Sequence, residues 1–239
     1  GLVGESGSGK SLSALAIAGL LKKRKNVIAD GEIVFAGHDD FLSLEESELC
    51  KLRGTDIGMI FQEPMTSLDP VRTIGWQVEE SLRIHTDLSK EERRARAMEA
   101  LRDVGLADTE RIYAAYPHEL SGGQRQRVMI AAAMIHKPKL LIADEPTTAL
   151  DVTIQAQILE LMQELQKKMG MAIIMVTHDL GVIADMCDEI IVMYGGRVCE
   201  RGTADAIFYD PRHEYTKGLL RSIPSVSRMK ERLVPIGGT

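Results

Sequence analysis

The stretch "GESGSGKS" at residues 4–11 decides the fold, because it satisfies the pattern G-x-x-x-x-G-K-[ST] in full. Glycines in such a loop let backbone N–H groups wrap a phosphate, and the helix that follows adds its positive end. Lys10 would then reach the β- and γ-phosphates of a nucleotide, and the Ser11 hydroxyl would bind Mg²⁺. An ordinary glycine-rich turn is a weak alternative, since a chance match in a chain this long is on the order of 1%. The predicted nucleotide-binding residues are Gly4, Glu5, Ser6, Gly7, Ser8, Gly9, Lys10 and Ser11.

Strands and helices alternate along the rest of the chain. The predicted strands are 31–40 (a strand and a turn), 56–64, 139–146, 171–179 and a hairpin at 189–202. The predicted helices are 12–23, 89–105, 121–138 and 154–170. The first helix carries apolar residues too densely for a surface helix, so it is expected to be buried. This alternation predicts an α/β fold with a mostly parallel sheet, interrupted by a mainly helical stretch from about 65 to 120.

Polar residues that follow predicted strands are the candidate catalytic groups. Asp144 follows the apolar run "LLIA", where a carboxylate beside a phosphate loop can hold Mg²⁺ through water. Glu145 can orient and deprotonate the attacking water. His178 follows "IIMVT" and can sense the γ-phosphate, and Gln62 follows "MIF" and can contact the metal or the water. We therefore predict Glu145, His178 and Gln62 as catalytic, and Ser11, Gln62 and Asp144 as metal-binding.

Composition excludes several classes of protein. The chain has 239 residues and a net charge of -6, which argues against nucleic acid as the main partner. It has no apolar run of the roughly 20 residues that cross a bilayer. Cys50, Cys187 and Cys199 have no metal-ligand spacing and are expected to be free thiols. Only Leu2 and Val3 separate Gly1 from the loop, so we expect the natural protein to begin upstream.

The ordered set of motifs resembles the nucleotide-binding subunit of ABC transporters. The segments that carry the resemblance are Gly4–Ser11, Gln62, Leu120–Gln124, Leu140–Glu145, Ala149–Asp151 and His178. The resemblance implies a P-loop NTPase core with an inserted helical signature subdomain, and ATP and Mg²⁺ as ligands. It also implies a head-to-tail dimer, in which "LSGGQ" caps the ATP held by the other chain. The residues so implied are Leu120, Ser121, Gly122, Gly123 and Gln124, with Asp151 in the D-loop.

The resemblance also implies a division of the chain. Residues 1–64 and 139–202 would form the RecA-like core, about 65–138 the helical subdomain, and 203–239 a C-terminal extension. The family's adenine-stacking aromatic residue lies upstream of the phosphate loop and is therefore expected before Gly1.

A narrower resemblance points to the ATPases of the oligopeptide, dipeptide and nickel import group. It rests on "FQEPMTSLDPVRTIGWQVEE", "DEPTTALDVTIQAQIL" and "RHEYTKGLLRSIP". The last stretch departs from the family's usual "HPYT", with Glu214 in place of proline. The resemblance implies a second ABC ATPase, identical or paralogous, transmembrane permease subunits and an external solute-binding protein. It places the chain peripherally on the cytoplasmic face of the inner membrane, where ATP hydrolysis powers solute import.

Residues 63–78 are the expected surface for coupling to the permease. They contain the only tryptophan, Trp76, which could lie in that surface or in the core of the helical subdomain. Two other functions fit the sequence less well. ABC ATPases that act on nucleic acid or ribosomes carry long basic or coiled-coil insertions, which this chain lacks. A catalytically silent module would be expected to lack Glu145, His178 or part of the signature, and all are present.

Overall fold

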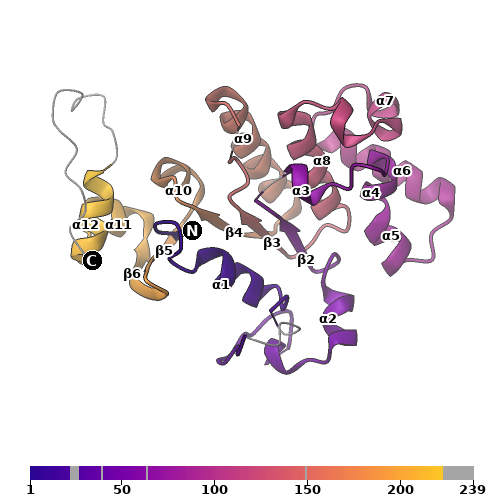
Figure 1. Cartoon of the computed structure of the whole chain (residues 1–239). Helices are drawn as coiled ribbons and strands as arrows, with labels where there is room; N and C mark the ends of the chain where they lie inside the picture. The colour runs from indigo at the N-terminus through magenta and orange to yellow at the C-terminus, as the bar shows by residue number, and fades with distance from the viewer. Residues whose placement is uncertain (22–26, 39, 63, 149, 223–239) are drawn as a thin grey trace. The chain divides into compact units, whose positions relative to one another are not determined.

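The computed structural model describes residues 1–21, 27–38, 40–62, 64–148 and 150–222. The chain separates into two compact units, one formed by Gly1–Ala14 with Met175–Thr239 and the other by Leu15–Ile174. Across the described residues, six strands form a mostly parallel sheet with helices along it, which confirms the predicted α/β class (Figure 1). The predicted domain boundaries remain a prediction.

The first unit is built around the short strand β1 (Leu2–Val3), which is fully enclosed between two neighbours. β1 pairs in parallel with the end of β4 (Ala172–Thr177) and with β5 (Glu189–Tyr194). β5 turns back into the antiparallel β6 (Arg197–Thr203), as the predicted hairpin requires. Gly195 and Gly196 have φ values of 54° and 78°, the left-handed conformation that a two-residue turn needs. The helices of this unit are α10 (Leu180–Met186), α11 (Ala204–Tyr209) and α12 (Glu214–Arg221).

Helix α1 (Lys10–Ile17) follows the phosphate loop and is shorter than predicted. The prediction for 12–23 was wrong because Gly19 adopts a left-handed φ of 69°, which ends a helix readily. Residues 22 and 23 lie outside the described residues. The expected burial was also wrong in part, since Leu12 is 52% exposed and only Lys10 and Ala14 of this helix are buried.

The strand predicted in residues 31–40 is absent from the described part of this stretch. Phe35 and His38 form only an isolated bridge around a turn, with Ala36 and Gly37 at positive φ. A strand is stabilised by a ladder of bonds to a neighbour. Among the described residues, this stretch pairs with no strand and makes only that isolated bridge. Its alternating pattern therefore does not form a strand.

The second unit contains two strands that follow their predicted ranges. β2 (Ile57–Ile60) pairs in parallel with β3 (Leu140–Asp144), whose side chains are all buried. The same unit contains α2 (Glu46–Leu52), α9 (Val152–Met169) and a short 3₁₀ turn at Phe41–Ser43. α9 ends at Gly170, and Ile158, Leu161 and Leu165 are buried along one face of it, while Ile154 on that face is partly exposed.

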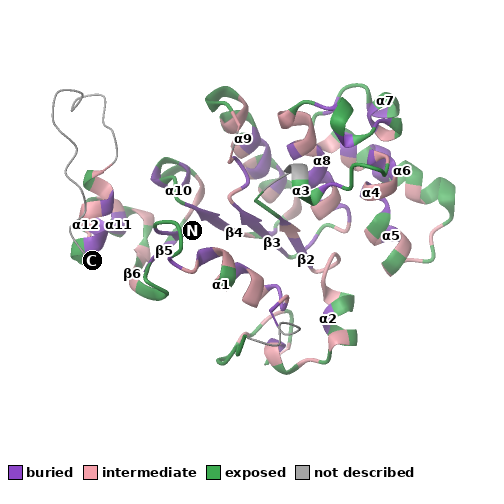
Figure 2. Cartoon of the chain, in the orientation of Figure 1, coloured by how far each residue is buried: buried purple, intermediate pink, exposed green. Residues whose placement is uncertain are grey.

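The stretch between β2 and β3 is mainly helical, as predicted. Its helices are α3 (Pro64–Ser67), α4 (Ile74–Val78), α5 (Glu80–His85), α6 (Lys90–Asp103), α7 (Thr109–Ala114) and α8 (Gly122–Met134), with a 3₁₀ turn at Pro117–Glu119. A capping box of Ser89 and Glu92 starts α6, within the predicted helix 89–105. Buried residues of this stretch include Ile74, Leu82, Leu101, Ile112 and Ile130, and Figure 2 shows buried, intermediate and exposed positions interspersed along α4 to α8.

Candidate nucleotide-binding and hydrolysis residues

The phosphate loop lies between β1 and α1 and follows the backbone of the β5–β6 hairpin closely. A Cβ atom on Gly4 would lie 2.1 Å from the Met193 carbonyl oxygen, so only glycine fits there. Gly9 has a φ of 99°, which side chains rarely adopt. The Gly196 N–H donates to the Ser8 carbonyl oxygen at 3.1 Å. The hairpin thus fixes the loop from one side.

Lys10 lies inside this loop and is only 5% exposed. Its ammonium group donates to the carbonyl oxygens of Gly4 at 2.7 Å and Glu5 at 2.9 Å. Ser8 is buried, and its hydroxyl oxygen has no hydrogen-bond partner among the described residues. A buried cation beside an unsatisfied hydroxyl, in a loop rich in backbone N–H groups, fits a bound anionic phosphate.

Magnesium would need few protein ligands at such a loop, because it keeps waters and binds the phosphates themselves. Ser11 is the second residue of α1, directly after Lys10. Asp144 is buried at the end of β3 in the other unit. No group of three or more His, Cys, Asp or Glu side chains able to hold a metal occurs within the described ranges. Hydroxyl and carboxylate oxygens are ligands that Mg²⁺ accepts, so each of these two residues, described within its own unit, fits its predicted role by its chemistry.

Gln62 and Glu145 meet, although 83 positions separate them in the chain. The Gln62 side-chain amide donates to a Glu145 carboxylate oxygen at 3.0 Å, and the Thr148 hydroxyl donates to the same oxygen at 2.9 Å. Glu145 has a φ of 48°, an uncommon value for a residue with a side chain. Strained backbone of this kind is concentrated at functional sites. Together these contacts hold the Glu145 carboxylate at the end of β3.

His178 directly follows β4, as predicted, and is exposed. The next residue, Asp179, accepts from the backbone N–H groups of Gly181 at 2.8 Å and Val182 at 3.4 Å, which starts α10. His178 belongs to the same unit as the phosphate loop, whereas Gln62, Asp144 and Glu145 belong to the other unit. The structure therefore brings the predicted residues together as two groups, each described within its own unit.

The segment "LSGGQ" starts α8 with an exposed capping box. The Ser121 hydroxyl accepts from the Gln124 N–H at 3.3 Å, and the Gln124 side chain accepts from the Ser121 N–H at 3.0 Å. A Cβ atom on Gly123 would lie 2.9 Å from Ile154 of α9, so this glycine lets the two helices approach. Asp151 caps α9 by accepting from the Ile154 N–H at 3.0 Å. Ala149 lies outside the described residues.

Comparison of the chain with known protein families agrees with this geometry. A protein-family model described as "ABC transporter" matches residues 1–148. The chain belongs to the ABC transporter family. A second model, described as "Oligopeptide/dipeptide transporter, C-terminal region", matches residues 199–239. Both resemblances expected from the sequence are thus confirmed.

Relatives of this ABC family member align with its whole length. The oligopeptide transport ATP-binding protein AppD of Bacillus subtilis is 53% identical over 238 residues, covering 100% of this chain and 72% of the relative. The dipeptide transport ATP-binding protein DppD of Escherichia coli is 52% identical, with the same coverage. A solved dimeric ATP-binding cassette, in a post-hydrolysis state with ADP and Pi, has a TM-score of 0.73 and 35% identity, covering 85% of this chain and 84% of that one.

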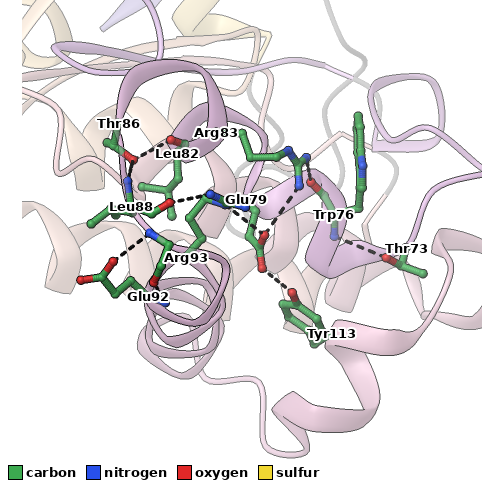
Figure 3. A network of polar contacts seen from close by, with 11 residues as sticks. Thr73, Trp76, Glu79, Leu82, Arg83, Thr86, Leu88, Glu92, Arg93 and Tyr113 are labelled. Carbon is green, nitrogen blue, oxygen red and sulfur yellow. Dashed lines mark hydrogen bonds and ion pairs between the residues drawn. The ribbon is translucent and has the colours of Figure 1, made fainter.

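The indole ring of Trp76 in this ABC cassette contacts the guanidinium groups of two arginines. The guanidinium carbons of Arg72 and Arg83 lie 4.5 and 4.3 Å from the centroid of the indole ring. Arg83 also donates to the Trp76 carbonyl oxygen (Figure 3). Trp76 is partly exposed, so it belongs neither wholly to the core nor wholly to an open surface. Of the predicted coupling segment 63–78, Glu63 lies outside the described residues.

A buried carboxylate anchors one of these arginines, Arg83. Glu79 is 4% exposed and accepts from the Tyr113 hydroxyl, while Arg83 and Arg93 approach it to 3.6 and 3.8 Å (Figure 3). Burial, followed by the hydrogen bond to Glu79, raises the pKa of Tyr113 to about 12. The network joins α4, α5, α6 and α7, and so stabilises the helical stretch that carries the signature segment.

Two residues that contact the candidate site residues were not predicted from the sequence. Thr148 bonds Glu145, and its position three residues after a candidate base is the one local signal that could have revealed it. Tyr215 accepts a hydrogen bond from the Glu5 N–H in the phosphate loop at 3.1 Å. The stretch around Tyr215 carried the narrower family resemblance, but no pattern in it indicated a contact with the loop.

Proposed function

We propose that this chain is the ATP-binding and ATP-hydrolysing subunit that powers import of peptides or related small solutes through a membrane permease. The observation that carries the proposal is the complete phosphate loop with Lys10 buried inside it. The names of the relatives, which are oligopeptide and dipeptide transport ATP-binding proteins, support the substrate class.

The loop and α1 bind the nucleotide in this proposal. Lys10 pairs its charge with the β- and γ-phosphates, and Gly4–Ser11 supplies backbone N–H groups to them. Ser11, Asp144 and Gln62 would hold the Mg²⁺ that accompanies ATP, with Asp144 acting through water. The ion would supply neutralisation of the charge that develops on the phosphate oxygens.

Hydrolysis depends on Glu145, which orients and deprotonates the attacking water. Gln62 and Thr148 hold its carboxylate by the hydrogen bonds of 3.0 and 2.9 Å described above. His178 donates to the γ-phosphate. These two hydrogen bonds preorganise the Glu145 carboxylate for that role.

The signature segment serves a second ATPase, identical or paralogous, in a head-to-tail dimer. Ser121, Gly122 and Gly123 contact the γ-phosphate held by the partner's loop, with Leu120, Gln124 and the D-loop residue Asp151 beside them. The exposed start of α8 supports this role, because its first N–H groups and dipole favour an anion. The dimeric state of the similar cassette supports the same arrangement.

The membrane partners follow from the same proposal. No helix in the described ranges has the length and apolar character to cross a bilayer. We propose that permease subunits contact residues 63–78 on the cytoplasmic face of the inner membrane, and that an external binding protein delivers the solute. In this scheme residues 1–64 and 139–202 form the core, about 65–138 the helical subdomain, and 203–239 the C-terminal extension.

Nucleotide titration of Lys10→Ala tests whether Gly4–Ser11 is the nucleotide site. The substitution deletes the charge paired with the phosphates, so Mg-ATP should bind at least about tenfold more weakly by calorimetry. Unchanged affinity would reject Gly4–Ser11 as the nucleotide site. Uptake of a labelled dipeptide into vesicles that carry the permease and the binding protein then tests the solute class.

A further inference from the structure

The C-terminal helix α12 reaches the phosphate loop through a single hydroxyl group. The backbone N–H of Glu5 donates to Tyr215 Oη at 3.1 Å, across 210 positions of sequence. Both residues belong to the same compact unit, and Tyr215 is only 7% exposed. This contact joins the segment matched by the C-terminal transporter model, residues 199–239, to the loop that binds phosphate.

Tyr215 and Lys10 hold opposite ends of one peptide group. The peptide between Gly4 and Glu5 offers its N–H to Tyr215, and its carbonyl oxygen accepts from the Lys10 ammonium at 2.7 Å. A peptide group is planar and rigid, so a bond at one end limits rotation at the other. The Tyr215 hydroxyl therefore acts on the orientation of the group that positions Lys10.

Tyr215 is itself held firmly. Glu200 of β6 accepts from the backbone N–H groups of Arg212 at 2.6 Å and His213 at 3.1 Å, just before α12. Burial opposes ionisation of Glu200, but the Thr216 side chain together with these N–H groups outweighs it and lowers the pKa of its carboxyl. The Tyr215 N–H donates to the His213 ring at 3.1 Å, and the Tyr215 ring packs on Tyr194 with centroids 4.5 Å apart.

The departure from the family's "HPYT" leaves this arrangement intact. Glu214 is the first residue of α12, a position where proline is also favoured and where an acidic side chain suits the helix dipole. His213 caps the helix one residue earlier. Tyr215 therefore still lies in the first turn of a capped helix.

We infer that Tyr215 is a positioning residue for ATP binding, through which the C-terminal segment sets the conformation of the phosphate loop. The inference rests on the proposed function, because it assumes that the loop binds the phosphates of ATP. Loss of one neutral hydrogen bond corresponds to roughly a 3- to 10-fold change in an equilibrium constant. The effect belongs to binding, since the loop holds the phosphates before and during the reaction alike.

The test compares Tyr215→Phe with Tyr209→Phe, which removes an exposed hydroxyl from the adjacent helix α11. Tyr215→Phe should raise the Kd for Mg-ATP and the KM for ATP about 3- to 10-fold, with kcat within about twofold of wild type. Amide hydrogen exchange of the peptide that contains Glu5 should become faster. Tyr209→Phe should change none of these values.

Lys10→Ala separates this inference from the proposed function. If Lys10→Ala loses ATP binding while Tyr215→Phe keeps wild-type Kd, KM and Glu5 exchange, the positioning role is wrong and the nucleotide site stands. A lower melting temperature of Tyr215→Phe with unchanged KM also overturns the role, since it indicates a purely structural contact. Wild-type affinity in Lys10→Ala overturns the proposed site, and the inference with it.

Discussion

The side-chain amide of Gln62 donates to the carboxylate of Glu145 at 3.0 Å, so the ends of β2 and β3 meet through their functional groups. The two strands are parallel neighbours in register, with Ile60 opposite Ala143. Each polar residue stands two positions beyond that last pair, where the strands' carboxyl ends present side chains at one edge. The register of the sheet therefore positions the predicted base.

Glu145→Gln should leave ATP binding intact and lower turnover about 10²- to 10⁴-fold. The amide keeps the shape of the side chain and can still accept from Gln62 and Thr148, but it cannot take a proton. Steady-state hydrolysis and nucleotide titration measure the two effects separately. Glu164→Gln, the same change on the exposed face of α9, is the matched control. Near-normal turnover in Glu145→Gln would reject the residue as the base.

Local patterns in the sequence predicted most of the fold and supplied the candidate site residues. The phosphate loop, the helix that starts at Ser89, and the strands that end before Gln62 and Glu145 each depend on neighbouring residues. The contacts that complete the site depend on residues far apart in sequence. Tyr215 and Glu5 are 210 positions apart, and the hydrogen bond between them leaves no periodic signal.

The wrong predictions have the same physical origin. Residues 31–40 alternate as a strand does, yet a strand also needs a partner, which local periodicity does not report. The apolar run after Lys10 predicted a longer helix, but Gly19 takes a left-handed φ and ends it. Propensity thus predicted the type of element at α1, and one glycine decided its length.

Tyr113→Phe should destabilise the helical stretch by about 1–3 kcal/mol at neutral pH, because the buried Glu79 carboxylate loses a donor. The pH dependence has a defined sign. Burial and then Glu79 raise the pKa of Tyr113 from 10.0 to about 12, so its contribution is fully present below pH 10 and is lost as the pH rises through 12.

Urea unfolding at about pH 8 and about pH 11 measures this contribution. Wild type should lose more unfolding free energy between the two pH values than Tyr113→Phe does. Tyr209→Phe, which removes an exposed hydroxyl, should behave as wild type. Equal losses in wild type and Tyr113→Phe would show that Tyr113 keeps its ordinary pKa.

Gly170→Ala should lower the unfolding free energy by about 1 kcal/mol. Gly170 ends α9 with a φ of 65°, and no atom lies within 4 Å of the place that an alanine Cβ would take, so only backbone strain is introduced. Chemical denaturation measures the change. An unchanged unfolding free energy would mean that the chain relaxes around the left-handed residue without cost.

Lys137→Gly should change the unfolding free energy in the opposite direction. Lys137 follows α8 with a φ of 54° although it carries a side chain, and its N–H donates to Met134 at 2.8 Å. Glycine removes the strain and keeps that bond, so the unfolding free energy should rise by about 0.5–1 kcal/mol. A loss of stability would mean that contacts of the lysine side chain outweigh its backbone strain.

Two inactive variants should regain hydrolysis when mixed, if "LSGGQ" serves the opposite chain. Lys10→Ala damages the half of a shared site that binds phosphate, and Ser121→Arg damages the half that caps it. Ser121 is exposed at the start of α8, so an arginine there blocks an interface without entering the core. Each variant paired with itself damages one half of both sites.

A mixed pair places both damaged halves in one composite site and leaves the other site intact. Hydrolysis should therefore reappear on mixing, and it should peak near equal amounts, where mixed pairs are most abundant. The expectation requires that identical chains pair, which co-purification of differently tagged chains reports, and that one intact site turns over, which the activity of co-purified wild type–Lys10→Ala pairs reports. If those pairs are active and the two variants show no recovery at any ratio, the shared-site geometry is wrong. If identical chains do not pair, the same test uses the paralogous partner with its phosphate-loop lysine changed. Ser121→Arg in this chain should then add no further loss, because both changes fall in the same composite site.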